Sequence, residues 1–165
     1  MRYSAIYDCD LANGLGWRVS LFVSGCRLHC KGCFNQCAWD FNYGKEYTEK
    51  TKDKIIELLS RPYIKGLSLL GGNPTEPENE PELIELCKEI KAKLPEKDIW
   101  IWSGDTYETL LRNNDKLIKY CDVLVDGPYV ESQRDASLAF RGSSNQRIID
   151  LKKSAESHST IVIDR

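Results

Sequence analysis

Four of the seven cysteines in this 165-residue chain fall within one short stretch, GCRLHCKGCFNQCAW. They are Cys26, Cys30, Cys33 and Cys37, with the spacing C-x3-C-x2-C-x3-C. Thiolates are soft metal ligands, and clustered thiols in a reducing cytosol more often bind metal than form disulfides. The stretch therefore predicts a metal centre. It leaves open which metal binds and how many of the four thiols hold it.

Three kinds of centre fit these cysteines. A structural zinc site needs four ligands, usually from two separated knuckles, and here His29 and all the thiols would come from one loop. A fully ligated four-iron cluster normally uses the spacing C-x2-C-x2-C with a later Cys-Pro, which differs from the spacing here. The third option uses only Cys26, Cys30 and Cys33. The fourth iron of a [4Fe–4S] cluster would then be free to bind a small molecule.

Charge and composition narrow the class of protein. The net charge is −2, with 23 basic and 25 acidic residues interspersed, so no basic face for nucleic acid or anionic lipid is indicated. No apolar run is long enough to cross a bilayer, and residues 1–8 lack the apolar core of a signal peptide. We therefore expect a cytoplasmic protein that binds neither nucleic acid nor membranes. The length suits a single domain over residues 1–165.

Apolar runs alternate with amphipathic segments along the chain, which indicates strands alternating with helices. Such alternation implies right-handed β-α-β units and a mainly parallel sheet. Because a closed eightfold barrel needs about 200 residues or more, we expect an open, partial (β/α) barrel. The expected strands are 18–23, 66–70, 98–102 and 122–125, with short ones at 148–149 and 161–163; the expected helices begin at Thr48, span 80–94 and begin after Asp105.

The third expected helix carries two checkable details. Asp105 with Glu108 three residues later fits a capping box. The helix would then bury an apolar face formed by Leu110, Leu111, Leu117, Ile118 and Cys121.

A glycine-bearing polar turn follows each of the four main strands. Since the carboxyl ends of parallel strands share one edge, these turns should open onto one ligand site. The turns are Ser24-Gly25-Cys26, Gly71-Gly72-Asn73-Pro74, Ser103-Gly104-Asp105 and Asp126-Gly127-Pro128-Tyr129.

Two of these turns carry a family resemblance. C-x3-C-x2-C after a first strand resembles the radical S-adenosylmethionine enzymes, and Gly71-Gly72-Asn73-Pro74 resembles their Gly-Gly-Glu-Pro turn, with Asn73 in place of the acid. Further blocks resemble one branch, the activators of anaerobic ribonucleoside-triphosphate reductase, and the likeness spans about residues 13–151. These blocks are 13–18 (NGLGWR), 21–26 (LFVSGC), 32–35 (GCFN), 122–129 (DVLVDGPY) and 140–147 (FRGSSNQR).

The resemblance implies a function. Cys26, Cys30 and Cys33 would hold a [4Fe–4S] cluster whose open iron binds S-adenosylmethionine. Reductive cleavage of this cofactor would generate a glycyl radical on the large subunit of the reductase. The electron would come from a one-electron donor such as flavodoxin. The chain would work as a homodimer or in a heterotetramer, and the sequence leaves that choice open.

The resemblance also implies cofactor contacts. Residues around the third cysteine would lie beside the cluster, the turn after the second strand would meet the methionine part, and the ends of the third and fourth strands would meet the ribose or carboxylate. Two alternatives stay open, namely activation of another glycyl radical enzyme such as pyruvate formate-lyase, and a non-enzymatic iron–sulfur or zinc module. The implied contacts are Gly32, Phe34, Gly71, Gly72, Asn73, Ser103 and Asp126.

Overall fold

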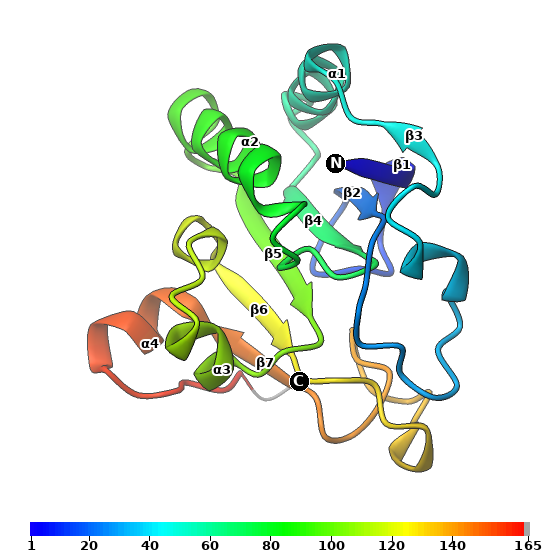
Figure 1. Ribbon diagram of the computed structural model, residues 1–165. Helices are drawn as coiled ribbons and strands as arrows, with labels where there is room; N and C mark the ends of the chain where they lie inside the picture. Colours follow the sequence, from blue (N-terminus) through cyan, green and yellow to red (C-terminus); the bar gives the residue numbers. More distant parts are fainter. Residues whose placement is uncertain (164–165) are drawn as a thin grey trace.

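The computed structural model describes residues 1–163, and within them seven strands form one open sheet (Figure 1). Their order across the sheet is β3-β1-β2-β4-β5-β6-β7. The pairs β2–β4, β4–β5 and β5–β6 are parallel, whereas β1 and β7 run antiparallel to their neighbours β2 and β6. The strands are β1 (Arg2–Asp10), β2 (Arg18–Val23), β3 (Lys45–Glu46), β4 (Gly66–Gly71), β5 (Asp98–Ser103), β6 (Val123–Asp126) and β7 (Arg147–Asp150).

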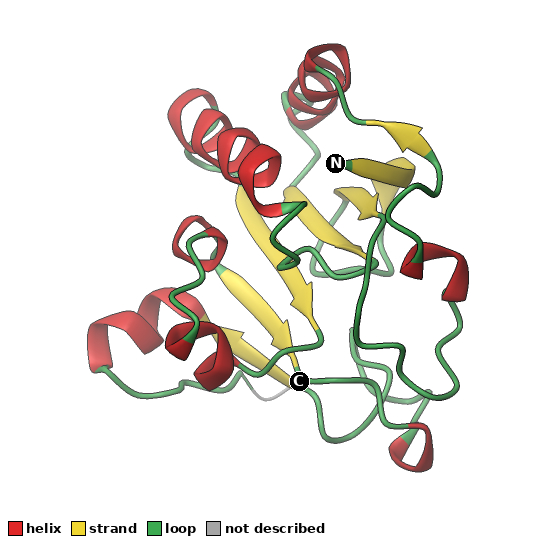
Figure 2. Ribbon diagram, in the orientation of Figure 1, coloured by secondary structure: helices red, strands yellow, loops and turns green. Residues whose placement is uncertain are grey.

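Helices cover one face of this sheet (Figures 1 and 2). Alternate strand residues such as Leu21, Leu67 and Ile99 point into the core on that face and are fully buried there. The helices are α1 (Glu49–Leu59), α2 (Glu80–Lys93), α3 (Tyr107–Arg112) and α4 (Leu151–Ser157), with 3-10 turns η1 (Gln36–Trp39), η2 (Leu117–Tyr120) and η3 (Glu131–Gln133).

The strand residues between those of the core carry a polar network on the other face. The Arg18 guanidinium is fully buried and pairs with the Asp98 carboxylate at 2.6 Å. It also donates to the hydroxyl of Ser68 at 2.7 Å and lies 5.3 Å from the centre of the Trp100 ring. This buried cation ties β2, β4 and β5 together at their amino ends.

Most expected elements are confirmed. The strand at 18–23 begins and ends as predicted, and the three others are displaced by one residue at most at either end. Thr48 is the N-cap of α1, where its hydroxyl accepts from the backbone N–H of Thr51. The expected strand at 148–149 is β7, whereas 161–163 contributes only a single antiparallel bridge between Ile149 and Val162.

The third helix differs from the prediction. Its N-cap is Thr106, whose hydroxyl accepts from the N–H of Thr109, so the Asp105–Glu108 capping box is wrong. The helix ends at Arg112, because Asn114 takes a left-handed conformation at φ +53°, and η2 is a separate turn. As a result Leu111 is 55% exposed instead of buried.

Three elements were not expected, namely β1, β3 and α4. Residues 2–10 lack a strict alternation of apolar and polar residues, yet β1 pairs with β2 along its length. The sheet is therefore mixed at both flanks. None of the helices within residues 1–163 is both long and apolar enough to cross a bilayer. The single-domain assignment stays a prediction.

Candidate iron–sulfur and cofactor site

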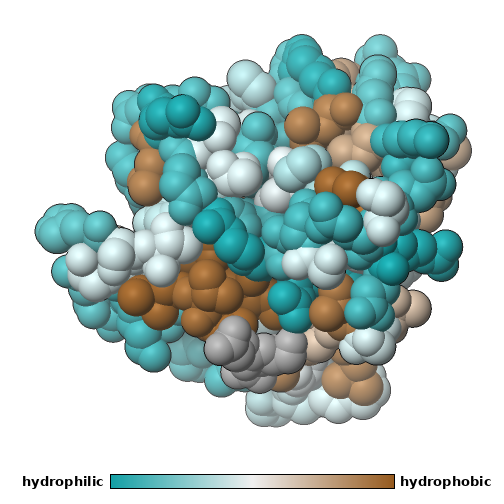
Figure 3. Space-filling model, turned by 90° about the horizontal axis from the view of Figure 1, so that it is seen from below, coloured by the Kyte–Doolittle hydropathy of each residue, from teal (hydrophilic) through white to brown (hydrophobic). Residues whose placement is uncertain are grey.

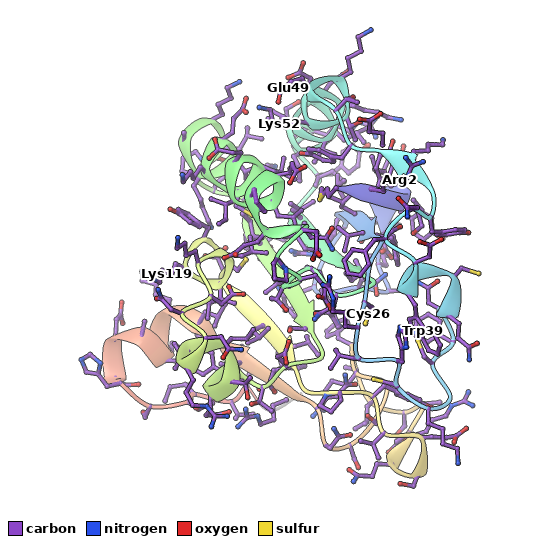
Figure 4. All side chains as sticks on the ribbon, viewed as in Figure 1. Arg2, Cys26, Trp39, Glu49, Lys52 and Lys119 are labelled. Carbon is purple, nitrogen blue, oxygen red and sulfur yellow. The ribbon has the colours of Figure 1, made fainter. Side chains whose placement is uncertain are left out.

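The cysteine-bearing loop leaves β2 and is closed at its base. The N–H of Gly25 donates to the carbonyl of Ala38 at 2.8 Å, and that of Cys26 donates to the carbonyl of Trp39 at 3.2 Å. Residues 25–39 therefore form one excursion pinned at both ends. Figure 4 shows Cys26 and Trp39 beyond the carboxyl ends of the parallel strands.

The predicted meeting of the four turns is found in the structure. One cavity of about 170 Å³ opens at the carboxyl edge of the sheet, and each turn contributes to its wall. Three of the four clustered thiols line it, while Cys37 is exposed on η1 and does not. The lining from these turns and the cysteine loop includes Cys26, Cys30, Cys33, Gly71, Gly72, Ser103, Gly104 and Gly127.

The turn after β4 lies directly on the backbone of the cysteine loop. The N–H of Gly72 donates to the carbonyl of Val23, and that of Asn73 to the carbonyl of Gly25, both at 2.8 Å. A Cβ on Gly72 would lie 2.5 Å from the Gly25 oxygen and 2.9 Å from that of Ala38. Glycine is required here because the two backbones approach too closely for any side chain.

An ion pair also holds the loop. Glu76, between β4 and α2, is 6% exposed and accepts from the N–H of Arg27 at 2.8 Å and from its guanidinium at 2.5 Å. Glu78 pairs with the same guanidinium, which lowers the pKa of Glu78 to about 2. The guanidinium also lies 4.4 Å from the centre of the Phe41 ring. Sequence reasoning missed this clamp because its partners are 49 residues apart.

The three thiols fit an iron–sulfur cluster by their chemistry. Cys26 is buried, and burial raises the pKa of its thiol, although N–H groups of Leu28 and His29 act in the opposite direction. Bound iron would deprotonate such a thiol outright. Within residues 1–163 no three His, Cys, Asp or Glu side chains already stand as a metal site. The donors are nevertheless three sulfurs of one loop around one cavity, which is the ligand type such clusters use.

Of the predicted cofactor contacts Asn73 and Ser103 at the strand ends, Ser103 lines the cavity and Asn73 does not. Asn73 is buried outside the cavity wall, and its carbonyl oxygen accepts from the hydroxyls of Thr75 at 3.0 Å and Ser103 at 3.3 Å. Ser103 does line the cavity. Asn73 is thus linked to the cavity wall by its hydrogen bond with Ser103. Direct contact with a cofactor stays a prediction for both residues.

Asp126 is buried beneath the cavity and is fully engaged. One carboxylate oxygen accepts from the Arg147 Nε at 3.0 Å, and the other accepts from the N–H of Tyr107 at 2.7 Å and from the Arg147 Nη2 at 2.5 Å. It does not line the cavity and instead joins β6 to α3 and β7. A cofactor role for Asp126 stays a prediction.

Of the two predicted contacts beside the third cysteine, Phe34 lines the cavity and Gly32 does not. Gly32 lies outside the cavity wall, and a Cβ there would come within 2.7 Å of the Glu131 carboxylate. Phe34 stands at the edge of the cavity with 96% of its surface exposed. Neither observation tests a contact with a bound cofactor.

Several wall residues are not among the predicted cofactor contacts. Tyr129 comes from the turn after β6, and Gln146 comes from the late segment 140–147, where its amide donates to the Gly127 carbonyl at 3.0 Å. Trp39 comes from η1, and its ring stacks on His29 at 4.4 Å between centres. The likeness of 140–147 to one enzyme branch pointed to this segment but to no particular side chain.

A larger cavity of about 900 Å³ lies elsewhere, between α3, η2 and α4. It is mostly apolar, with Leu111, Ile118 and Leu151 in its wall. None of Cys26, Cys30 and Cys33 lines it, so its size does not make it the chemical site. Figure 3 shows hydrophobic residues gathered on the underside of the molecule.

Known proteins resemble the chain over most of its length. It is 45% identical over 150 residues to an anaerobic ribonucleoside-triphosphate reductase-activating protein of Vibrio cholerae, covering 90% of this chain and 97% of that protein. The protein of the same name from phage T4 is 43% identical over 148 residues, covering 90% and 93%. That of Escherichia coli K12 is 42% identical over 154 residues, covering 92% and 100%.

A family model described as a 4Fe-4S single cluster domain matches residues 12–149. This range contains all three cavity-lining cysteines and the turns that surround them. By these matches the chain belongs to the family of anaerobic ribonucleoside-triphosphate reductase-activating proteins, and it carries a 4Fe-4S single cluster domain.

Proposed function

We propose that this protein activates an anaerobic ribonucleoside-triphosphate reductase by generating a glycyl radical on the large subunit of that enzyme. One observation carries the proposal: Cys26, Cys30 and Cys33 line a single cavity with the turns of β4, β5 and β6, in a chain of this family. When bound there, a [4Fe–4S] cluster and S-adenosylmethionine supply the one-electron cleavage chemistry. We infer that the open sheet is the partial barrel of radical S-adenosylmethionine enzymes.

The three thiols hold the cluster, and Cys37 stays outside it. Since three thiolates serve four irons, one iron is left for a small ligand. Gly71 and Gly72 present backbone instead of side chains to the cavity, which leaves room for that ligand.

The remaining polar groups orient the ligand. The Ser103 hydroxyl lines the cavity and can rotate between its partners and a bound polar group. Asn73 supports Ser103 and offers a neutral acceptor where relatives of the wider superfamily have an acid. Asp126 holds the β6 turn in place through Arg147 and the N–H of Tyr107.

Water must be kept from the reacting atoms. Trp39 and Tyr129 flank the cavity, and both are large rings suited to excluding solvent. The protein thus positions the bound groups and excludes water from them, while the one-electron cleavage chemistry belongs to the cluster and the cofactor.

Anaerobic reconstitution tests the proposal. The protein is loaded with iron and sulfide, reduced and given S-adenosylmethionine, and 5′-deoxyadenosine is measured. The reductase is then added, and a glycyl radical is sought by electron paramagnetic resonance. We expect both signals. A protein that holds a cluster but makes no 5′-deoxyadenosine would overturn the proposal, and a radical formed on pyruvate formate-lyase alone would change its target.

The proposal also covers the cellular compartment, the electron donor and the assembly of the protein. We propose that the protein is cytoplasmic, that a flavodoxin-type protein donates the electron, and that the chain acts as a homodimer or in a heterotetramer with the reductase. Replacing the chemical reductant by reduced flavodoxin tests the donor. Sizing the chain with and without the reductase decides between the two assemblies.

A further inference from the structure

Phe34 is a large apolar side chain with almost no contacts of its own. It follows Cys33 directly and stands at the edge of the cavity with 96% of its surface exposed. Among residues 1–163, no other aromatic ring and no cation packs against its ring. An exposed ring beside a chemical site is a candidate for a surface that becomes buried on binding.

The neighbouring rim is apolar as well. Leu28 lines the same cavity and is 37% exposed. It packs over the turn after β5, because a Cβ on Gly104 would lie 2.1 Å from a Leu28 methyl carbon. Leu28 therefore forms the inner part of this rim, and Phe34 forms the outer part.

The proposed target, a glycine of the reductase, limits how the activator can recognise it. A glycine has no side chain, so the residues that flank it must supply the binding energy. Those residues have to pass over the cavity mouth, because the hydrogen atom leaves the glycine Cα only in direct contact with the site. The activator needs a contact outside the cavity, on the side that faces the incoming segment.

We propose that Phe34 is this contact: its ring packs against apolar side chains next to the target glycine of the reductase and determines how well that segment is held. The inference rests on the proposed function. If the ring serves the reductase, it is not one of the cofactor contacts that the family resemblance implies. The thiols, the glycine turns and rings such as Trp39 and Tyr129 line the cavity, whereas the Phe34 ring at its edge projects almost entirely into solvent.

The experiment distinguishes a role of the Phe34 ring in binding the reductase from a role in binding S-adenosylmethionine. Phe34→Ala, Phe34→Tyr and wild type are loaded with cluster under identical conditions. One assay measures the reductase concentration that gives half the maximal rate of glycyl radical formation. A second measures the KM for S-adenosylmethionine in cleavage without reductase. Tyr63→Ala is the matched control, since Tyr63 is an exposed aromatic (55%) that lies outside the cavity.

We expect Phe34→Ala to raise the half-saturating reductase concentration about tenfold, as for loss of about 1.4 kcal/mol of binding. The KM of Phe34→Ala for S-adenosylmethionine should stay within about twofold of the wild-type value. Phe34→Tyr, which keeps an aromatic ring, should bind the reductase as wild type does. A raised KM for S-adenosylmethionine with unchanged reductase dependence would overturn the inference, as would no change in either. If wild type forms no glycyl radical on the reductase, the proposed function itself fails.

Discussion

Glu76 binds both the backbone and the side chain of Arg27. One carboxylate oxygen accepts from the Arg27 N–H at 2.8 Å, and the other accepts from its guanidinium at 2.5 Å. Arg27 lies between the first two cysteines of the cavity, and Glu76 lies in the segment that leads into α2. The loop that presents the thiols is thus fixed to the β4–α2 connection by the buried carboxylate of Glu76.

This clamp should matter for cluster retention. Glu76→Gln keeps the shape but loses the charge, and a hydrogen bond to a charged group contributes about 1.5–3 kcal/mol. We expect iron to be lost to a chelator about tenfold faster, measured as iron released over time. Glu78→Gln is the control, because Glu78 pairs with the same guanidinium on its exposed side and does not accept from the Arg27 N–H. Equal loss rates for the two variants would argue against the clamp.

Gly72 is the second point where the loop depends on its surroundings. In Gly72→Ala the new Cβ would meet two backbone oxygens at 2.5 and 2.9 Å, and neither can move without shifting the loop. We expect the free energy of unfolding of the apo protein to fall by about 1–3 kcal/mol, as for overpacking, measured by urea denaturation. In Gly142→Ala the nearest atoms belong to the Tyr129 side chain at 3.1 Å, so a much smaller change is expected. Similar losses in both variants would contradict this account.

Local sequence patterns predicted much of the fold and the position of the site. Apolar runs and the glycine turns that end them are local features of the sequence, so β2, β4, β5 and β6 could be located from it. Because these strands were expected to be parallel, their turns were expected at one edge of the sheet. The structure brings those turns together around the thiols. The order of the parallel strands then follows from connection rules.

What escaped prediction depends on contacts distant in sequence or on fine backbone geometry. The end of α3 follows from the left-handed conformation of Asn114, and only the weak preference of asparagine for such helix ends marks it in the sequence. Residues 2–10 show no strict alternation of apolar and polar residues that would mark β1, and Gln146 reaches the cavity only through the folding of residues 140–147. Asn73 and Asp126 were predicted as cofactor contacts from the family resemblance, and the structure adds hydrogen bonds from Ser103 and Arg147 that no local pattern indicates.

The two outer cysteines of the Cys30-to-Cys37 stretch should behave differently. Cys30 lines the cavity, whereas Cys37 is exposed on η1 and lies outside its wall. Cys30→Ala should lose the cluster and abolish 5′-deoxyadenosine formation, while Cys37→Ala should retain both. Iron and acid-labile sulfide per chain, measured after reconstitution, check this. A Cys37→Ala protein without cluster would show that four thiols are used.

Arg18 should be essential for the stability of the fold, although it lies at the amino ends of the strands, far from the cysteine site. Removing it in Arg18→Ala leaves the Asp98 carboxylate without its partner at 2.6 Å and the Ser68 hydroxyl without a donor. Breaking a buried pair costs about 3–5 kcal/mol; since the Asp98 side chain is 27% exposed, we expect a loss near the lower end and unfolding at clearly lower urea. Lys153→Ala removes an exposed pair at 3.5 Å and should change little. A stable Arg18→Ala protein would refute this role.

Acid should weaken the contact between Glu108 and Arg147. The hydrogen bond from Arg147 lowers the pKa of Glu108 from 4.5 to about 2. Because the pKa in the folded protein is depressed, the stabilisation is present above pH 4.5 and is lost as the pH falls toward 2. The carboxylate is half exposed, so screening limits the effect to about 0.2–1 kcal/mol.

Glu108→Gln tests this linkage in the apo protein. Its free energy of unfolding should lie below that of wild type at pH 6, and the two values should converge as the pH approaches 2, as measured by urea denaturation at each pH. A difference that does not vary with pH would mean that the charge of Glu108 contributes nothing. In that case Asp126 alone holds Arg147, with its two contacts at 3.0 and 2.5 Å, and links β6 to β7.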